Sequence, residues 1–192
     1  MSERQLLLSK AMLMRGEGVL QSSGIFDASI SLLLLQDSVE MALHAVATKI
    51  GAKPPRKAAF EDYWGLIDSA GTQFGQLPMK IDMGRMNSAR VDLKHHGNRP
   101  DREGVEEHFR NGRAFLGKVT AQYFSPLDFE RLSIVSLVAD EEIRAQLEAA
   151  EGQVKNDDLR AALISCAHAY KLIRVDLPRF RGQFSISISR SL

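Results

Sequence analysis

The sequence predicts an all-α fold, a single helical bundle of about seven helices with a short C-terminal tail. Apolar residues recur at intervals of three and four along every long segment, which is typical of helices with one buried face. Short connections rich in glycine, proline and serine separate these segments. The 44% hydrophobic content of the 192 residues is ordinary for a globular protein. We therefore expect one helical domain over residues 1–178, with residues 179–192 as the tail.

The first two helices are bounded by small residues. The first is expected over 2–21, because Ser2 and Gln5 have the spacing of a capping box and a Ser-Ser-Gly stretch follows. The second is expected over 26–50 and ends at Gly51. Its apolar stripe comprises Leu32, Leu35, Val39, Ala42, Leu43, Val46 and Ile50.

Two shorter helices follow a rigid Lys-Pro-Pro linker. One is expected over 57–70, with Phe60, Trp64 and Ile67 on its inner face. The other begins near Pro78, where a missing amide hydrogen costs nothing, and ends at His96 before Gly97. Its predicted core residues are Ile81, Met86, Ala89 and Leu93.

Three more helices complete the expected bundle. The fifth opens at Asp101 as the N-cap and runs towards Ser125-Pro126. The sixth is expected over 128–154 with Leu132 and Val135 inward, and the seventh over 159–175, capped by Asn156 or Asp157 and ended before Pro178. Residues 184–189 alternate polar and apolar residues, as in an edge strand, a docking peptide or a disordered tail.

Composition excludes several classes of protein. The longest uninterrupted apolar run, 32–35, is too short to span a bilayer, and the N-terminus does not have the pattern of a signal peptide. Cys166 is the single cysteine, so an internal disulfide is excluded, and its apolar helical surroundings favour a core residue over a nucleophile. We expect a soluble protein of the reducing cytoplasm that does not bind a membrane.

Charge is unevenly distributed although the net charge is only +1. Residues 128–158 contain nine acidic and three basic residues, whereas residues 171–192 contain five basic residues and one acidic residue. This asymmetry permits a nucleic-acid-binding face, but an ordinary solvated surface of mixed charge would give the same pattern.

The sequence predicts neither a cofactor nor a metal site. It contains no Gly-rich P-loop and no His-Glu-x-x-His motif. The adjacent histidines, His95 and His96, would project about 100° apart on a helix and make a poor chelating pair. Aromatic residues Phe60 and Trp64 could stack on bases, although their helical spacing is more typical of a core.

Residues 87–97 carry the strongest chemical signal. Asn87, Arg90 and Lys94 fall along one polar strip beside the apolar face of the fourth helix. Arginine presents a fork of donors suited to phosphate, and a histidine can move a proton near neutral pH. Together these groups could break an RNA backbone without a metal ion. The alternative is that the lysine and histidines only cap the carbonyls at the helix C-terminus.

The Arg-x4-His spacing of Arg90 and His95, late in a helix of an all-helical chain, resembles the HEPN family (higher eukaryotes and prokaryotes nucleotide-binding domain). The resemblance covers about residues 26–124. It implies RNA cleavage by Arg90 and His95 in a homodimer whose two motifs face one cleft, with His96 as the reserve for His95. It also implies a role in phage defence or a toxin–antitoxin system, with an antitoxin or defence protein as partner. Val91 departs from the polar residue that active members commonly carry after the arginine.

Further roles and alternatives accompany this hypothesis. Asn87 and Lys94 would hold the phosphate, and Glu40 on the second helix would orient the histidine, unless it is simply a solvated carboxylate. The first alternative is a non-catalytic helical module that dimerises or docks a partner, which Val91 favours. The second is a basic RNA-binding domain without cleavage, to which residues 171–192 would contribute.

Overall fold

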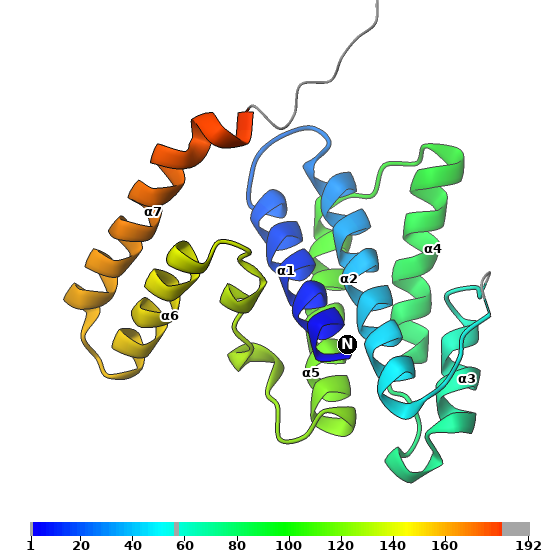
Figure 1. Ribbon diagram of the computed structural model, residues 1–192. Helices are drawn as coiled ribbons and strands as arrows, with labels where there is room; N and C mark the ends of the chain where they lie inside the picture. Colours follow the sequence, from blue (N-terminus) through cyan, green and yellow to red (C-terminus); the bar gives the residue numbers. More distant parts are fainter. Residues whose placement is uncertain (1, 56–57, 182–192) are drawn as a thin grey trace, which may run out of the picture. The chain divides into compact units, whose positions relative to one another are not determined.

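The computed structural model describes residues 2–55 and 58–181, and the side chains of 175–181 are not described. Within these residues every regular element is a helix, which confirms the predicted all-α class of about seven helices (Figure 1). Contacts group the chain into two compact units, an N-terminal unit over residues 1–134 and a C-terminal unit over residues 135–192. The expected strand over 184–189 lies outside the described residues.

The N-terminal unit contains five α-helices. Their bounds are α1 Ser2–Leu20, α2 Asp27–Ile50, α3 Asp62–Ala70, α4 Lys80–His96 and α5 Arg102–Tyr123. Short 3₁₀ turns follow α3 at Thr72–Phe74 and α5 at Phe129–Arg131. Figure 1 shows α1 and α2 side by side, and α2 contacts α3, α4 and α5 as well. Helix α2 is therefore the central element of this unit.

The core of the N-terminal unit surrounds α2. The predicted apolar stripe of α2 is buried from Leu32 to Val46, with Leu32, Leu35 and Val39 fully inaccessible, and Ile50 at its end is partly buried. Trp64 and Phe60 are buried too, and the Trp64 indole donates to the Pro78 carbonyl at 3.1 Å, so these rings serve the core rather than a base-stacking surface. Ile81, which was expected inward on α4, is instead 72% exposed, and Met83 takes the buried position.

Close helix contacts fix the positions of α1 and α5 on α2. The Ser38 hydroxyl donates to the Ser9 carbonyl at 2.7 Å, inside the α1–α2 contact. At Gly112 of α5, an added Cβ would lie 2.7 Å from Leu35, so α5 approaches α2 too closely for a larger residue. The predicted N-cap of α5 is confirmed, since the Asp101 carboxylate accepts from the Gly104 N–H at 2.7 Å.

Helix α2 is long and apolar enough to cross a membrane by length and composition, and it is the only described helix that passes this test. However, 61% of its most apolar window is buried inside the protein. A core helix meets the same criterion, so the finding is weak evidence, and the absence of a membrane span stays a prediction.

The C-terminal unit is a helical hairpin. A 3₁₀ turn at Val135–Leu137 precedes α6, Glu141–Lys155, and α7, Leu159–Arg181. The expected helix over 128–154 is wrong in its first half, because the chain makes 3₁₀ turns there and α6 begins only after its N-cap, Asp140. Asp158 supplies the capping oxygen at the start of α7, and the helix continues past the expected end before Pro178.

The position of Cys166 contradicts a further expectation. The apolar pattern of α7 suggested a buried thiol, but Cys166 is exposed. The small residues Ala162, Ser165 and Ala169 are buried instead. Because α6 and α7 pack as a close hairpin, the face of α7 with small side chains is the buried one.

Candidate functional site

The predicted motif lies on the C-terminal half of α4. This helix is regular from Lys80 to His96, and Gly97 ends it with a φ of 70°, a left-handed conformation that suits glycine. The Gly97 N–H donates to the Leu93 carbonyl at 3.2 Å and closes the last turn. The helix therefore does not unwind before Gly97, and side chains along it follow regular helical geometry.

Arg90 borders the buried face of α4, as the sequence indicated. The residue is half-buried, and its Nε atom is buried without a hydrogen-bond partner among the described residues. Asn87 is half-buried one turn earlier, and Lys94 is exposed one turn later. Neither Arg90 nor Lys94 forms an ion pair with any residue that the structure describes. The strip therefore combines one half-buried cation, Arg90, and one exposed cation, Lys94.

A carboxylate that sequence reasoning missed faces these two cations from α2. Partial burial raises the pKa of Asp37 above its ordinary value, and neighbouring Glu40 raises it further. Arg90 and Lys94 act in the opposite direction and lower the pKa of Asp37. Asp37 is therefore within electrostatic reach of both cations, and it offsets part of the positive charge of the strip.

Glu40 belongs to the same α2 surface, and in the structure it is bonded within its own helix. Its Oε2 atom accepts a hydrogen bond from Gln36 Nε2 at 2.8 Å, one turn earlier on α2. The Gln36 side chain is almost completely buried, and its other polar atom, Oε1, has no partner among the described residues. Glu40 thus influences Asp37 electrostatically, and its hydrogen bond goes to Gln36 rather than to His95 or His96.

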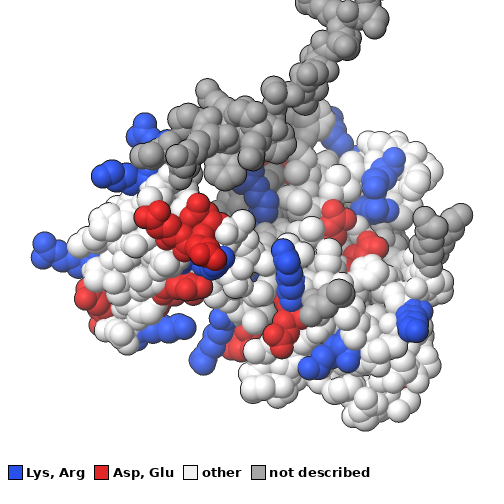
Figure 2. Space-filling view, viewed as in Figure 1, with Lys and Arg blue, Asp and Glu red and all other residues white. Residues whose placement is uncertain are grey.

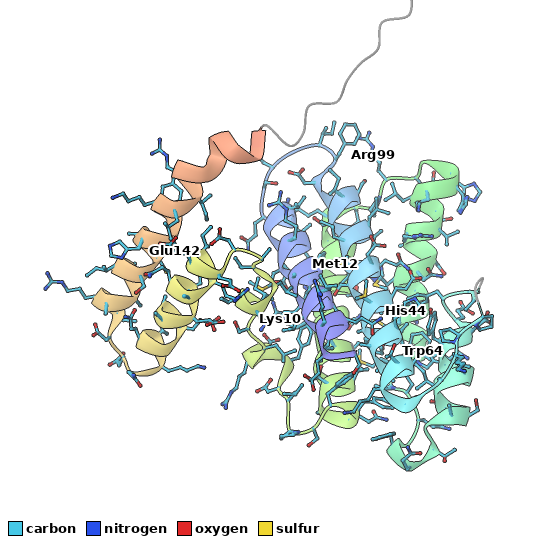
Figure 3. The ribbon with its side chains drawn as sticks, in the orientation of Figure 1. Lys10, Met12, His44, Trp64, Arg99 and Glu142 are labelled. Carbon is cyan, nitrogen blue, oxygen red and sulfur yellow. The ribbon has the colours of Figure 1, made fainter. Side chains whose placement is uncertain are left out.

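His44 lies one turn after Glu40 on α2 (Figure 3) and contacts Tyr63 of α3. The Tyr63 hydroxyl and His44 Nε2 are 2.8 Å apart, and the two rings meet edge to face at 5.2 Å between centroids. Burial raises the pKa of Tyr63, and the negative charge of Glu40 adds to this effect. Sequence reasoning missed both residues, although Gln36, Glu40 and His44 recur every four residues along one side of the helix.

His95 and His96 are both exposed at the end of α4. On a regular helix, His95 projects about 140° from Arg90 and His96 about 120° from it on the other flank. One chain alone therefore does not bring either imidazole to the Arg90 guanidinium. A second copy of the chain, or a bound substrate long enough to contact both, has to join them.

A small hollow of about 240 Å³ lies between the end of α4 and the start of α5. It is lined by Ala89, Asp92, Asn98, Arg99, Pro100, Asp101, Gly104 and His108. Burial lowers the pKa of His108, and the nearby carboxylates of Glu107 and Asp101 oppose this shift. The Arg99 guanidinium lies 5.6 Å from the ring centroid of exposed Phe26 (Figure 3). His108 is a titratable group that the sequence motif did not include.

Charges of both signs are interspersed on the face of the N-terminal unit shown in Figure 2, which carries no continuous basic surface in that view. Within the described ranges, no three His, Cys, Asp or Glu residues lie together in an arrangement that could hold a metal ion. In comparisons with protein-family models, curated proteins and solved structures, no match to the chain was found.

Proposed function

We propose that this chain is a metal-independent endoribonuclease that cleaves single-stranded RNA with Arg90 and His95 as its catalytic groups. The observation that carries the proposal is the α4 strip, where the unpaired cations Arg90 and Lys94 lie one turn apart and two histidines follow. The resemblance to the HEPN family supports it further, and with it a place in phage defence or a toxin–antitoxin system in the cytoplasm.

The proposed reaction needs one cation and two proton transfers. An imidazole takes the proton from a ribose 2′-hydroxyl, whose oxygen attacks the adjacent phosphorus. Arg90 stabilises the added negative charge, and Lys94 and Asn87 hold the flanking phosphate. The 5′-oxygen leaves with a proton from a second imidazole, and a 2′,3′-cyclic phosphate remains. A single strand is preferred because in-line attack requires a backbone that a duplex restrains.

The active form in this proposal is a homodimer. Arg90 and His95 diverge on one α4 helix, so the catalytic pair has to combine Arg90 of one chain with His95, or His96 in reserve, of another. Two such pairs would then line a shared cleft. This arrangement makes the assignment testable by mixing two inactive variants.

The test uses the purified full-length protein, labelled single-stranded RNA and excess EDTA. Arg90→Ala and His95→Ala should each abolish cleavage, whereas Arg85→Ala, which removes an exposed cation from the same helix, should leave cleavage intact. Products should carry 2′,3′-cyclic phosphate ends. An equal mixture of the two inactive variants should recover part of the activity, because a mixed dimer has one intact Arg90–His95 pair. Cleavage that survives both single substitutions would refute the assignment.

The electrostatics of the strip gives a separate test of RNA binding. Asp37 faces Arg90 and Lys94, so its negative charge opposes an approaching phosphate. Asp37→Asn should therefore strengthen RNA binding at low salt. The measurement compares the Arg90→Ala protein with the Arg90→Ala, Asp37→Asn protein by fluorescence anisotropy, because Arg90→Ala prevents cleavage in both. Unchanged or weaker binding would mean that RNA does not contact this strip.

The second candidate is a non-catalytic module that dimerises or docks a partner protein. Two observations favour it: the separation of Arg90 from both histidines in one chain, and the carboxylate of Asp37, which offsets part of the charge of the two cations. It predicts a stable complex, no cleavage in EDTA and no effect of His95→Ala on assembly.

A further inference from the structure

Helix α7 has one buried face and one exposed apolar face. Ala162, Ser165 and Ala169 are buried, and the Ser165 hydroxyl donates to Gln153 Oε1 of α6 at 2.9 Å. The large side chains lie on a neighbouring face that α6 does not cover. This exposed stripe consists of Leu159 (59% exposed), Leu163 (71%), Cys166, Tyr170 (61%) and Ile173 (44%).

The exposed stripe has the spacing of a coiled-coil seam. Its members follow one another at intervals of four, three, four and three residues, which is the heptad pattern of helices that pair along their length. In the sequence the same intervals continue at Leu177 and Phe180. A contiguous apolar stripe in water is unfavourable, and in soluble proteins such surfaces usually mark an interface. A two-helix hairpin cannot cover it alone.

We propose that a second copy of this chain covers the exposed stripe, with the two α7 helices parallel and the two α6–α7 hairpins forming a four-helix arrangement. Helical hairpins with apolar faces commonly pair in this way. The inference concerns the C-terminal unit alone. It therefore goes beyond the proposed ribonuclease function and holds whether or not the chain cleaves RNA.

Charge complementarity favours a second copy over an unrelated partner. Helix α6 contains four acidic and two basic residues, a balance of −2, and Figure 2 shows acidic side chains gathered over it. Over 159–174, α7 contains Arg160, Lys171 and Arg174 and no acidic residue, a balance of +3. The same hairpin thus carries both an acidic and a basic helix, so basic α7 of one copy can attract acidic α6 of the other copy.

The flanks of the stripe select the parallel orientation. Ala162 and Ala169 lie on the flank towards α6, whereas Arg160 and Arg174 lie on the opposite flank, by helical geometry. In a parallel pair, the arginine flank of one copy faces the flank of the other copy that carries acidic α6. An antiparallel pair would instead place Arg160 near Arg174 of the second copy, which is a like-charge contact.

Cys166 occupies the middle of the exposed stripe, two stripe positions from either end of the described seam. In a parallel pair, equivalent seam residues of the two helices lie opposite each other. Cys166 of one copy should therefore face Cys166 of the other. Because the chain contains no other cysteine, a disulfide between two chains can form only through this residue.

The first experiment measures the mass of the full-length protein by light scattering and sedimentation equilibrium. A dimer of the 21.3 kDa chain is expected. Leu163→Gln with Tyr170→Gln should raise the dimer dissociation constant by about a hundredfold, because both changes remove central apolar contacts. The matched control, Ile164→Gln, changes an equally apolar side chain that is 50% exposed on the same helix but lies off the stripe. It should leave the dissociation constant unchanged.

The second experiment identifies the partner surface by oxidation with diamide, which accepts the two electrons and two protons that two thiols release. Wild-type protein should form a covalent dimer rapidly. A variant with the cysteine moved off the stripe, Cys166→Ser with Ile164→Cys, should form the covalent dimer far more slowly.

A third experiment reverses the charge on the arginine flank of the stripe. Arg160→Glu and Arg174→Glu together should weaken the dimer by about tenfold, because the attraction to α6 is lost.

Three results would overturn the inference. The first is a monomer at all concentrations up to about 100 µM, a range that covers weak specific dimers. The second is a dimer whose dissociation constant does not respond to the stripe substitutions. The third is a monomer that sediments with vesicles of anionic lipid through Leu163 and Tyr170, which would assign the stripe to a membrane surface instead.

Discussion

Gly112 allows a close approach of α5 to α2, and its replacement by alanine tests that contact quantitatively. An alanine Cβ would lie 2.7 Å from Leu35 Cδ1, whereas carbon atoms in favourable contact are about 3.5–4.0 Å apart. Leu35 is completely buried and has no solvent to move into. Overpacking of this kind costs roughly 1–3 kcal/mol, while replacing a helical glycine by alanine contributes about 1 kcal/mol of stability. The net expected change is therefore a loss of up to about 2 kcal/mol.

Gly117, five residues later in α5, provides the matched control. A Cβ there would meet no atom within 4 Å, so Gly117→Ala should increase the free energy of unfolding by about 1 kcal/mol. Because the helix-propensity gain is shared, the difference between the variants isolates the α2–α5 contact, at roughly 1–3 kcal/mol.

The assay is urea denaturation followed by tryptophan fluorescence. The chain has one tryptophan, Trp64, which is buried in the core of the N-terminal unit, so its emission reports on the unfolding of that unit. Equal stabilisation by Gly112→Ala and Gly117→Ala would refute the close contact, and with it the described position of α5 on α2.

Three further predictions concern the titration of Asp37 and His108 and the partly buried contacts of Lys10. Folding raises the pKa of Asp37 above its ordinary value of 3.8. The stability that protonated Asp37 contributes is therefore complete below pH 3.8 and is lost as the pH rises. Asp37→Asn should therefore stabilise the protein against urea at pH 7 but not at pH 3, and the opposite order would contradict this sign. Burial lowers the pKa of His108 below 6.5. The stability that neutral His108 contributes above pH 6.5 should therefore be lost as the pH falls. His108→Gln should reduce this loss of stability between pH 7 and pH 5. An NMR titration of His108 with a midpoint above 6.5 would contradict the cause. Lys10 Nζ donates to the carbonyls of Glu130 and Leu132 at 2.7 and 2.6 Å, so Lys10→Met should cost roughly 1–3 kcal/mol in thermal and urea unfolding. Exposed Lys118→Met should cost almost nothing, and similar losses in both would show that the Lys10 contacts contribute no stability.

The helices of the N-terminal unit could be predicted well because each has a strong periodic pattern and a clear break. Helix α2 has an uninterrupted apolar stripe and a left-handed Gly51 at its end, and Asp101 caps α5 as expected. The segment 128–140 was harder, since Leu132 and Val135 continue the helical period. The aspartates at both ends, Asp128 and Asp140, each accept local backbone hydrogen bonds, and such bonds compete with a continuous helix.

The burial of α7 shows where periodicity alone misleads. Both of its faces read as apolar, and the face with larger residues, including Cys166, was expected inside. The structure buries the smaller face because helices in a hairpin approach most closely through alanine and serine. Sequence alone cannot say which of two apolar faces meets the neighbouring helix, since that choice depends on the partner element.

The candidate site could be predicted only in part. Arg90 was placed correctly at the border of the core, because its position follows from the helical period of α4. Asp37, His44 and Tyr63 were missed, since the interaction of Asp37 with Arg90 and the contact of His44 with Tyr63 arise from packing of α2 against α4 and α3, which no local pattern encodes. The roles of Arg90, His95 and Glu40 in catalysis stay predictions.

The segment after α5 is fastened to α1 by side chains rather than by regular structure. Arg113 forms ion pairs with Glu17 at 2.7 Å and with Glu130 at 2.6 Å, and Lys10 binds two carbonyls of the same segment. All of these attachments end by Leu132, just before the boundary of the two units. A shortened gene ending at Ile134 would thus encode these ion pairs and hydrogen bonds, together with Trp64, Arg90 and His95. Such a fragment offers a direct way to study the α4 strip without α7.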